Sequence, residues 1–203
     1  GSGSIEVDGG ASCWAGGGGA MAIEYTDPTS VMPGLFARPG TTTCGGVDKV
    51  GGAGTVFVRG PQATFGAVTI DSGGRGEGIV ELPSLGSGIA QLGSSTNTLV
   101  TDRTDNVWPY FAGHWVRVTN SAGIVKGTWR IATIAAKTVT LAPNGNETIS
   151  IAQGDKWQGV YRFDAMTLRN VELRSADLVE AEAQTIAGVV TTTSLKGGSL
   201  ALA

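Results

Sequence analysis

The sequence is poor in charge, aromatic side chains, cysteine and histidine. Charged residues make up 15% of its 203 residues, against roughly 25% in an average soluble protein, so a disordered polar tail is not expected. No apolar run approaches the ~18 residues that a membrane-spanning helix needs. The 14 Lys and Arg residues are scattered and the net charge is −3, whereas nucleic-acid binders carry a basic stripe. We therefore expect no membrane span and no nucleic-acid partner.

The same scarcity limits the available chemistry. The single histidine, His114, has no G-x-S-x-G partner for Ser-His-Asp catalysis, and neither cysteine belongs to a CxxC pair that would suggest zinc. Enzymes that cleave polysaccharides on a β-helix use paired carboxylates. The candidates are dispersed rather than clustered: Asp102, Asp105, Asp155 and Asp164. We therefore predict that the chain is not an enzyme, with a polysaccharide lyase or glycoside hydrolase as the alternative.

The two cysteines, Cys13 and Cys44, both lie in Gly-rich loop sequence. A disulfide between them would close a loop of about thirty residues and contribute a few kcal/mol. Two free thiols are the alternative, because a disulfide requires an oxidising compartment.

Glycine is abundant, with 33 residues, or about 16% where roughly 7% is usual. It has no three-residue period, which excludes collagen. Residues 1–90 hold 23 of the glycines, and these separate short runs that are rich in Val, Ile and Phe. Such short strands become stable when they stack in register, with glycine at tight turns and close backbone approaches. The predicted strands are residues 5–7, 21–25, 55–59, 67–71 and 78–82.

The middle of the chain has a different pattern. Residues 108–163 hold eight of the thirteen aromatic residues. Strict alternation of apolar and polar residues predicts antiparallel strands with one buried face, and turn residues at 120–123 and at Asn144-Gly145 predict hairpins. The predicted strands are residues 116–119, 128–132 and 138–141.

The last part of the chain returns to short β-prone pieces with small residues between them. Residues 176–186 alternate as Val-Glu-Ala-Glu-Ala, which favours a strand over one or two helical turns. We therefore predict Gly-rich coils over residues 1–91, an inserted antiparallel module over 92–163 and returning coils over 164–203. The other predicted strands in the last part are residues 166–168, 171–173, 178–179, 189–191 and 200–202.

Several segments resemble the Gly-rich parts of very large bacterial surface and secreted proteins, which are often adhesin-like repeat proteins. The resemblance lies in Gly-Ser-Ile-Glu-Val-Asp at residues 3–8, in Gly16–Gly19 followed by Met-Ala-Ile-Glu-Tyr, and in the segments that begin at Gly51 and Phe65. It implies an all-β fold, a right-handed parallel β-helix (solenoid) interrupted by a small antiparallel β-barrel or sandwich. It also implies an extracellular or bacterial cell-surface location and a structural, adhesive function. The implied partners are other segments of the same large protein, a surface glycan or a cell-surface protein.

Aromatic side chains that stack on sugar rings are the candidate ligand-binding residues. They are Trp14, Trp108, Tyr110 and Trp157, and Trp108 and Tyr110 belong to a predicted loop, Trp-Pro-Tyr-Phe. Packing of the inserted module against the coils would bury the same side chains, and this is the alternative. A carbohydrate-binding function is the third possibility, beside the structural role and the enzyme.

No cofactor is expected, because Gly51-Gly52-Ala53-Gly54 precedes a strand and opens no helix that could hold a phosphate. Calcium is the alternative. Asp71-Ser72-Gly73-Gly74, with Glu77 and Glu81 nearby, could donate oxygen ligands, but an Asp followed by Gly more often forms only a turn.

Overall fold

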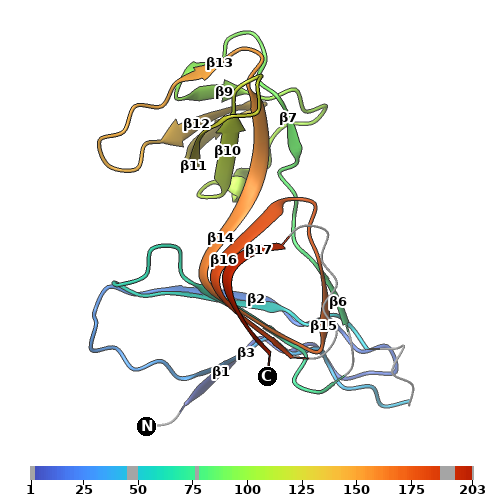
Figure 1. Ribbon diagram of the computed structural model, residues 1–203. Helices are drawn as coiled ribbons and strands as arrows, with labels where there is room; N and C mark the ends of the chain where they lie inside the picture. The colour runs from blue at the N-terminus through green and yellow to red at the C-terminus, as the bar shows by residue number, and fades with distance from the viewer. Residues whose placement is uncertain (1–2, 45–49, 76–77, 188–194, 203) are drawn as a thin grey trace. The chain divides into compact units, whose positions relative to one another are not determined.

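The computed structural model describes residues 3–44, 50–75, 78–187 and 195–202. It is an all-β protein in which short strands dominate (Figure 1). The first strands are β1 (Ser4–Glu6), β2 (Ala20–Glu24), β3 (Gly34–Phe36), β4 (Thr55–Arg59), β5 (Ala67–Asp71) and β6 (Gly78–Glu81). The next are β7 (Ser87–Ile89), β8 (Ser95–Thr96), β9 (Thr98–Val100), β10 (Trp115–Thr119), β11 (Val125–Ala135) and β12 (Thr138–Ala142). The last are β13 (Ile151–Ala152), β14 (Lys156–Arg169), β15 (Val171–Arg174), β16 (Leu178–Ala187) and β17 (Leu195–Leu202).

Each predicted strand that lies within the described residues overlaps a strand of the structure, but some strands are much longer than predicted: β14 begins at Lys156, whereas the predicted strand begins at residue 166. The alternating segment 176–186 forms the strand β16 and no helix. Five short strands, β3, β7, β8, β9 and β13, were not predicted. The predicted strand at residues 189–191 and the candidate calcium ligand Glu77 lie outside the described residues.

The chain divides into two compact units. Unit 1 comprises residues 1–82, 162–175 and 180–203, and unit 2 comprises residues 83–161 and 176–179. The long strand β14 contributes residues to both.

Unit 1 is built mainly from parallel strand pairs. β1 pairs with β3, β2 with β4, β5 with β14 and β6 with β15, all parallel. β4 and β5 are antiparallel, because the chain reverses between Arg59 and Ala67. The sheet is therefore mixed, and the winding of like-oriented strands is interrupted at this point.

The core of unit 1 follows the period of two along these strands. Val68 and Ile70 on β5 lie beside Met166 and Leu168 on β14, and all four are at most 5% exposed. Residues on the opposite face of β5, such as Thr69 and Asp71, are only partly buried. The alternation thus separates a closed apolar face from an accessible polar face.

Glycine backbones pack directly against one another in the first part of unit 1. The Gly16–Gly19 run donates N–H groups to Gly10, Val7 and Gly52, and the N–H of Gly54 donates to the carbonyl of Ala37, all at 2.7–3.0 Å. These extended segments bond to neighbours on more than one side, so they form a bundle rather than a sheet. A Cβ built on Gly54 would overlap the carbonyl oxygen of Gly19, so only glycine fits there.

Unit 2 consists of antiparallel strands. Its strand order is β13-β8-β9-β12-β11-β10-β14, and β7 also pairs with β14. The described strands do not close into a barrel. One apolar cluster fills the buried side, and its most deeply buried members, each at most 2% exposed, are Leu85, Ala90, Leu99, Phe111, Val116, Val118, Trp129, Ile131, Val139, Leu141 and Trp157.

The two predicted hairpins of unit 2 have different outcomes. The turn at residues 120–123 joins the paired strands β10 and β11, with Gly123 at φ +85°, as predicted. Asn144-Gly145 forms a turn but no hairpin, because the next strand, β13, pairs with β8 instead of β12. β12 is instead paired with β11 through a turn at Ala136-Lys137, where Ala136 has φ +55°.

Among the described residues, no helix is long and apolar enough to cross a membrane.

Candidate functional site

The candidate site is an exposed aromatic pair on the 3-10 turn η2 (Pro109–Phe111) in unit 2. Trp108 and Tyr110 are 58% and 64% exposed. Their ring centroids lie 6.5 Å apart and their planes differ by 7°. Burial of aromatic rings supplies much of the free energy of protein cores and interfaces. Two near-parallel rings that stay exposed to solvent are therefore candidates for burial against a ligand. Trp108 and Tyr110 thus form an exposed, stacked aromatic pair.

The local sequence explains why this turn is rigid. Pro109 is fixed near the φ of a helical first turn, and the N–H groups of Phe111 and Ala112 donate to the carbonyls of Trp108 and Pro109 at 3.0 Å. Phe111 is 2% exposed and anchors the turn in the apolar cluster of unit 2. Its ring lies 4.7 Å from the ring of Tyr110. The exposed rings are thus held by a buried neighbour.

His114 extends this aromatic chain into the interior of unit 2. Its ring makes edge contacts with Phe111 at 5.4 Å and with Tyr161 at 4.6 Å. Its Nε2 lies 3.0 Å from Oδ2 of Asp177. The Tyr161 hydroxyl donates to the carbonyl of Pro83. Burial raises the pKa of Tyr161, and the charge of Asp177 raises it further, so this phenol stays a neutral donor.

Asp177 is the hydrogen-bonding centre beneath the aromatic turn. Its carboxylate is fully buried and accepts from the Ser84 hydroxyl at 2.7 Å, the Leu85 N–H at 2.8 Å and the Gly86 N–H at 2.9 Å, in addition to His114. Burial acts to raise the pKa of Asp177, but these hydrogen bonds outweigh it and hold the pKa below its usual value. A Cβ on Gly159 would overlap this carboxylate, so glycine on β14 leaves room for it.

This arrangement is a structural network and not a catalytic triad. A nucleophilic serine must donate to the histidine that activates it, whereas Ser84 donates to Asp177 itself. No sequence pattern indicated Ser84 or Asp177, which lie 93 residues apart and belong to no motif. They meet only because the residue before β16 lies next to the segment that precedes β7.

The other candidate aromatic residues fall into different environments. Trp14 is 73% exposed, close to Cys13 in the Gly-rich loop. Trp157 is 2% exposed, and its indole N–H donates to Oδ1 of Asp102 at 3.1 Å. A buried indole offers no face to a glycan, so Trp157 is corrected here from a candidate ligand residue to a core residue. On β14, Trp157 is buried between Lys156, which is exposed, and Gln158, which is partly buried.

The dispersed carboxylates serve local structure. Asp155 accepts from the Lys126 ammonium and the Ala152 N–H, both at 2.8 Å. Asp164 accepts from the N–H groups of Phe65 and Gly66 at 2.9–3.1 Å. Together with Asp102 beneath Trp157, these groups stabilise turns and side chains.

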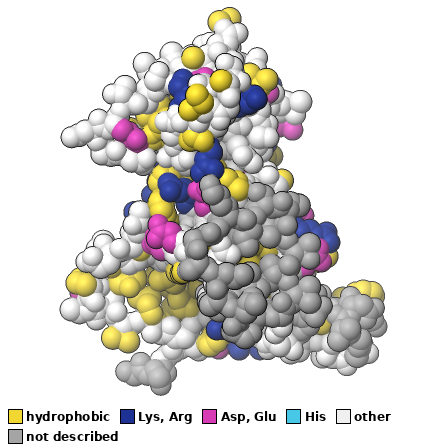
Figure 2. Space-filling model, viewed as in Figure 1, with side chains coloured by type: hydrophobic (Ala, Val, Ile, Leu, Met, Phe, Trp, Pro, Cys, Tyr) yellow, Lys and Arg dark blue, Asp and Glu magenta, His cyan; other side chains and the backbone are white. Residues whose placement is uncertain are grey.

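Neither metal-binding groups nor charged clusters indicate another site among the described residues. Among the residues that the structure describes, no group of three or more His, Cys, Asp or Glu could hold a metal ion. The Asp71 carboxylate accepts from the Gly73 N–H at 2.7 Å, as in a turn. On the face shown in Figure 2, Lys and Arg side chains lie in small groups with Asp and Glu nearby, without a continuous basic stripe.

Cys13 and Cys44 form a disulfide, with their Cα atoms 4.8 Å apart. The adjacent backbone is tied as well, because Ser12 and Thr42 form a parallel bridge. Disulfides persist in oxidising environments such as the periplasm and the cell exterior.

Reduction of this disulfide is expected to lower the free energy of unfolding of unit 1 by about 3–4 kcal/mol, because the reduced chain regains the entropy of a loop of about thirty residues. Urea unfolding with and without dithiothreitol measures the difference. The Cys13→Ser/Cys44→Ser double variant should show the reduced value in both conditions. An unchanged midpoint on reduction would contradict the prediction.

The sequence matches no protein-family model and no curated protein. Among solved structures, the tailspike of Pseudomonas phage phi297 is similar with a TM-score of 0.28 and 12% sequence identity. The similarity covers 86% of this chain and 29% of the tailspike chain. The chain thus spans less than a third of the length of that structure.

Proposed function

We propose that this chain is a structural, adhesive segment of a bacterial cell-surface or secreted protein, and that it presents Trp108 and Tyr110 for contact with a glycan. In this proposal, unit 1 is a solenoid-like scaffold of the right-handed parallel β-helix type. Parallel strand pairing and glycine packing support this reading, and the disulfide suits an oxidising exterior. Other segments of the same protein are its structural partners.

The observation that carries the proposal is the rigid exposure of the aromatic pair. Sugar rings have apolar C–H faces that pack on aromatic rings, and the packing is strongest when the rings are held in place before binding. Trp108 and Tyr110 meet both requirements, because their rings are exposed and their turn is anchored by Phe111. A flexible loop would lose more entropy on binding.

Removing either ring is expected to weaken glycan binding at least tenfold, because each ring supplies a large part of the exposed aromatic surface of the pair. A glycan array with the intact chain identifies the ligand, and titration of that ligand against Trp108→Ala and Tyr110→Ala measures the loss. Trp14→Ala is the matched control, since it removes another exposed indole, 73% exposed, at a distant position in the sequence.

Equal affinity in the intact chain and in the two variants would contradict the proposal, as would the absence of saturable binding to any glycan. Loss of affinity in Trp14→Ala alone would move the site to the disulfide loop. Circular dichroism of each variant shows whether the fold is kept.

A polysaccharide-degrading β-helix protein is the alternative. Its reaction would need two carboxylates facing one substrate, whereas Asp102, Asp155 and Asp164 are engaged by structural donors. Depolymerisation of a bound polysaccharide, followed as the appearance of new reducing ends, would favour this alternative over the adhesive function.

A further inference from the structure

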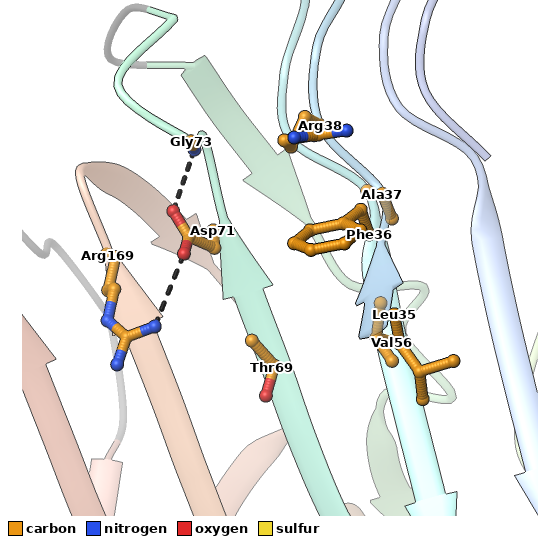
Figure 3. A pocket seen from close by; sticks show the side chains of 10 residues that line it. Leu35, Phe36, Ala37, Arg38, Val56, Thr69, Asp71, Gly73 and Arg169 are labelled. Atoms are coloured by element: carbon orange, nitrogen blue, oxygen red, sulfur yellow. Dashed lines mark hydrogen bonds and ion pairs between the residues drawn. The ribbon is translucent and has the colours of Figure 1, made fainter. Parts of the chain in front are cut away.

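Unit 1 contains a separate cavity on the accessible face of its sheet. It has a volume of about 190 Å³ and lies between β3 with the residues that follow it and the strands β4, β5 and β14 (Figure 3). The volume equals that of about six water molecules at ~30 Å³ each. Pockets for drug-sized ligands start at ~300 Å³, so this cavity suits one small ring-shaped molecule.

The walls of the cavity combine an apolar side with a polar edge. Leu35 and Phe36 on β3 and Val56 on β4 supply the apolar side. Figure 3 shows the Phe36 ring extending from β3 toward β5, which carries Thr69 and Asp71. The period of two places these two polar side chains on one face of β5.

The polar edge offers both donors and an acceptor in one plane of the sheet. Asp71 and Arg169 are direct neighbours in the parallel register of β5 and β14, and Oδ2 of Asp71 lies 3.4 Å from a terminal guanidinium nitrogen of Arg169. The Arg169 side chain is 49% exposed and has five N–H donors, so donors remain for a ligand. Adjacent hydroxyl groups on one ring match such a pair, with one donating to the carboxylate and the other accepting from the guanidinium.

The charges around the cavity compensate one another. The Arg38 guanidinium bonds to Asp8 at 2.8 Å and to Glu6 at 3.2 Å, and Arg75 reaches the same Asp8 oxygen at 3.0 Å. Burial acts to raise the pKa of Asp8, but the bonds to Arg38 outweigh it and lower the pKa, so the carboxylate stays charged. With Asp71 beside Arg169, three cations face three carboxylates, which favours an uncharged ligand over an anion.

We infer that this cavity binds one uncharged sugar residue, with Phe36 against its C–H face and Asp71 and Arg169 on two neighbouring hydroxyl groups. The inference rests on unit 1 alone and does not depend on the aromatic pair of unit 2.

The test is an NMR titration of the chain with methyl glycosides of glucose, galactose and mannose, with N-acetylglucosamine, and with glucuronate as the anionic probe. At least one neutral sugar is expected to bind saturably with a Kd in the millimolar range, as befits one small ring. Asp71→Asn and Arg169→Gln should each weaken it at least tenfold. Asp71→Asn keeps an oxygen that can still accept from the Gly73 N–H.

Arg174→Gln is the matched control, because Arg174 forms an exposed pair with Glu172 on the neighbouring strand β15, away from the cavity. It should bind as the intact chain does. The inference would be overturned if no neutral sugar bound saturably, or if the Asp71 and Arg169 variants bound as tightly as the intact chain. It would also be overturned if glucuronate bound more tightly than every neutral sugar. Trp108→Ala should leave this binding unchanged, and its loss there would assign the binding to the aromatic pair.

Discussion

Asp177→Ala is expected to destabilise unit 2 by about 4 kcal/mol. The substitution leaves buried donors on Ser84, Leu85, Gly86 and His114 without their acceptor. Unsatisfied buried groups cost ~1–3 kcal/mol each, and breaking a buried charged network costs ~3–5 kcal/mol. Urea unfolding followed by tryptophan fluorescence measures the change, since Trp129 and Trp157 lie in the core of unit 2.

Asp105→Ala is the matched control, because Asp105 is exposed and its nearest hydroxyl, that of Thr104, is 3.5 Å away. Its effect should lie within about 0.5 kcal/mol of zero. A loss of less than about 1 kcal/mol in Asp177→Ala would show that the network contributes little to stability.

The same network gives the stability of unit 2 a defined pH dependence. The pKa of Asp177 in the folded protein lies below its value in the unfolded chain, about 4. Its contribution is therefore fully present above pH about 4 and is lost as the pH falls through the lower, folded pKa. The difference in unfolding free energy between the intact chain and Asp177→Asn should shrink as the pH falls below about 4. A difference that stays constant in acid would contradict the assignment.

Gly54→Ala is expected to destabilise unit 1 by about 3–5 kcal/mol. The new methyl group would meet the Gly19 carbonyl, which belongs to the backbone and cannot turn aside as a side chain would. Relief of this overlap requires the two segments to separate, which also breaks the hydrogen bonds from Gly54 to Ala37 and from Thr55 to Gly19. Overpacking costs ~1–3 kcal/mol, and each hydrogen bond adds ~1 kcal/mol.

Gly10→Ala is the control for this substitution, because nothing lies within 4 Å of a Cβ at Gly10. It should be neutral, or stabilising by up to about 1 kcal/mol through the unfolded state. Thermal unfolding of both variants compares them directly. Similar midpoints for Gly54→Ala and Gly10→Ala would contradict the prediction, because they would show that a side chain is tolerated where the glycine backbones pack closely.

The two hairpins of unit 2 show where local sequence is informative. The residues at 120–123 form a hairpin because their turn chemistry and the flanking alternation favour the same structure. Ala136-Lys137 carries no turn signal. Its backbone carbonyls are held by Thr101 and Val107, whose N–H groups donate to Lys137 and Ala136 at 2.9–3.0 Å. Hydrogen bonds from residues 29 and 36 positions away thus stabilise a conformation that alanine adopts at a cost of ~1–2 kcal/mol.

The candidate site shows the same division between local and distant information. The exposure of Trp108 and Tyr110 follows from a short Trp-Pro-Tyr-Phe segment that the sequence already marked as a loop. The support of that segment by His114 depends on Asp177, 63 residues after His114. The burial of Trp157 depends likewise on its partner strands β7 and β10.

By itself, the sequence determined that this protein is built mainly from short strands. Alternation with a period of two, and glycines that end the strands, are signals that extend over only a few residues. Only the tertiary structure decided which strands pair, where the winding reverses between β4 and β5, and which carboxylates and aromatic rings meet. Those outcomes depend on contacts between residues far apart in the chain, whose energies no local pattern records.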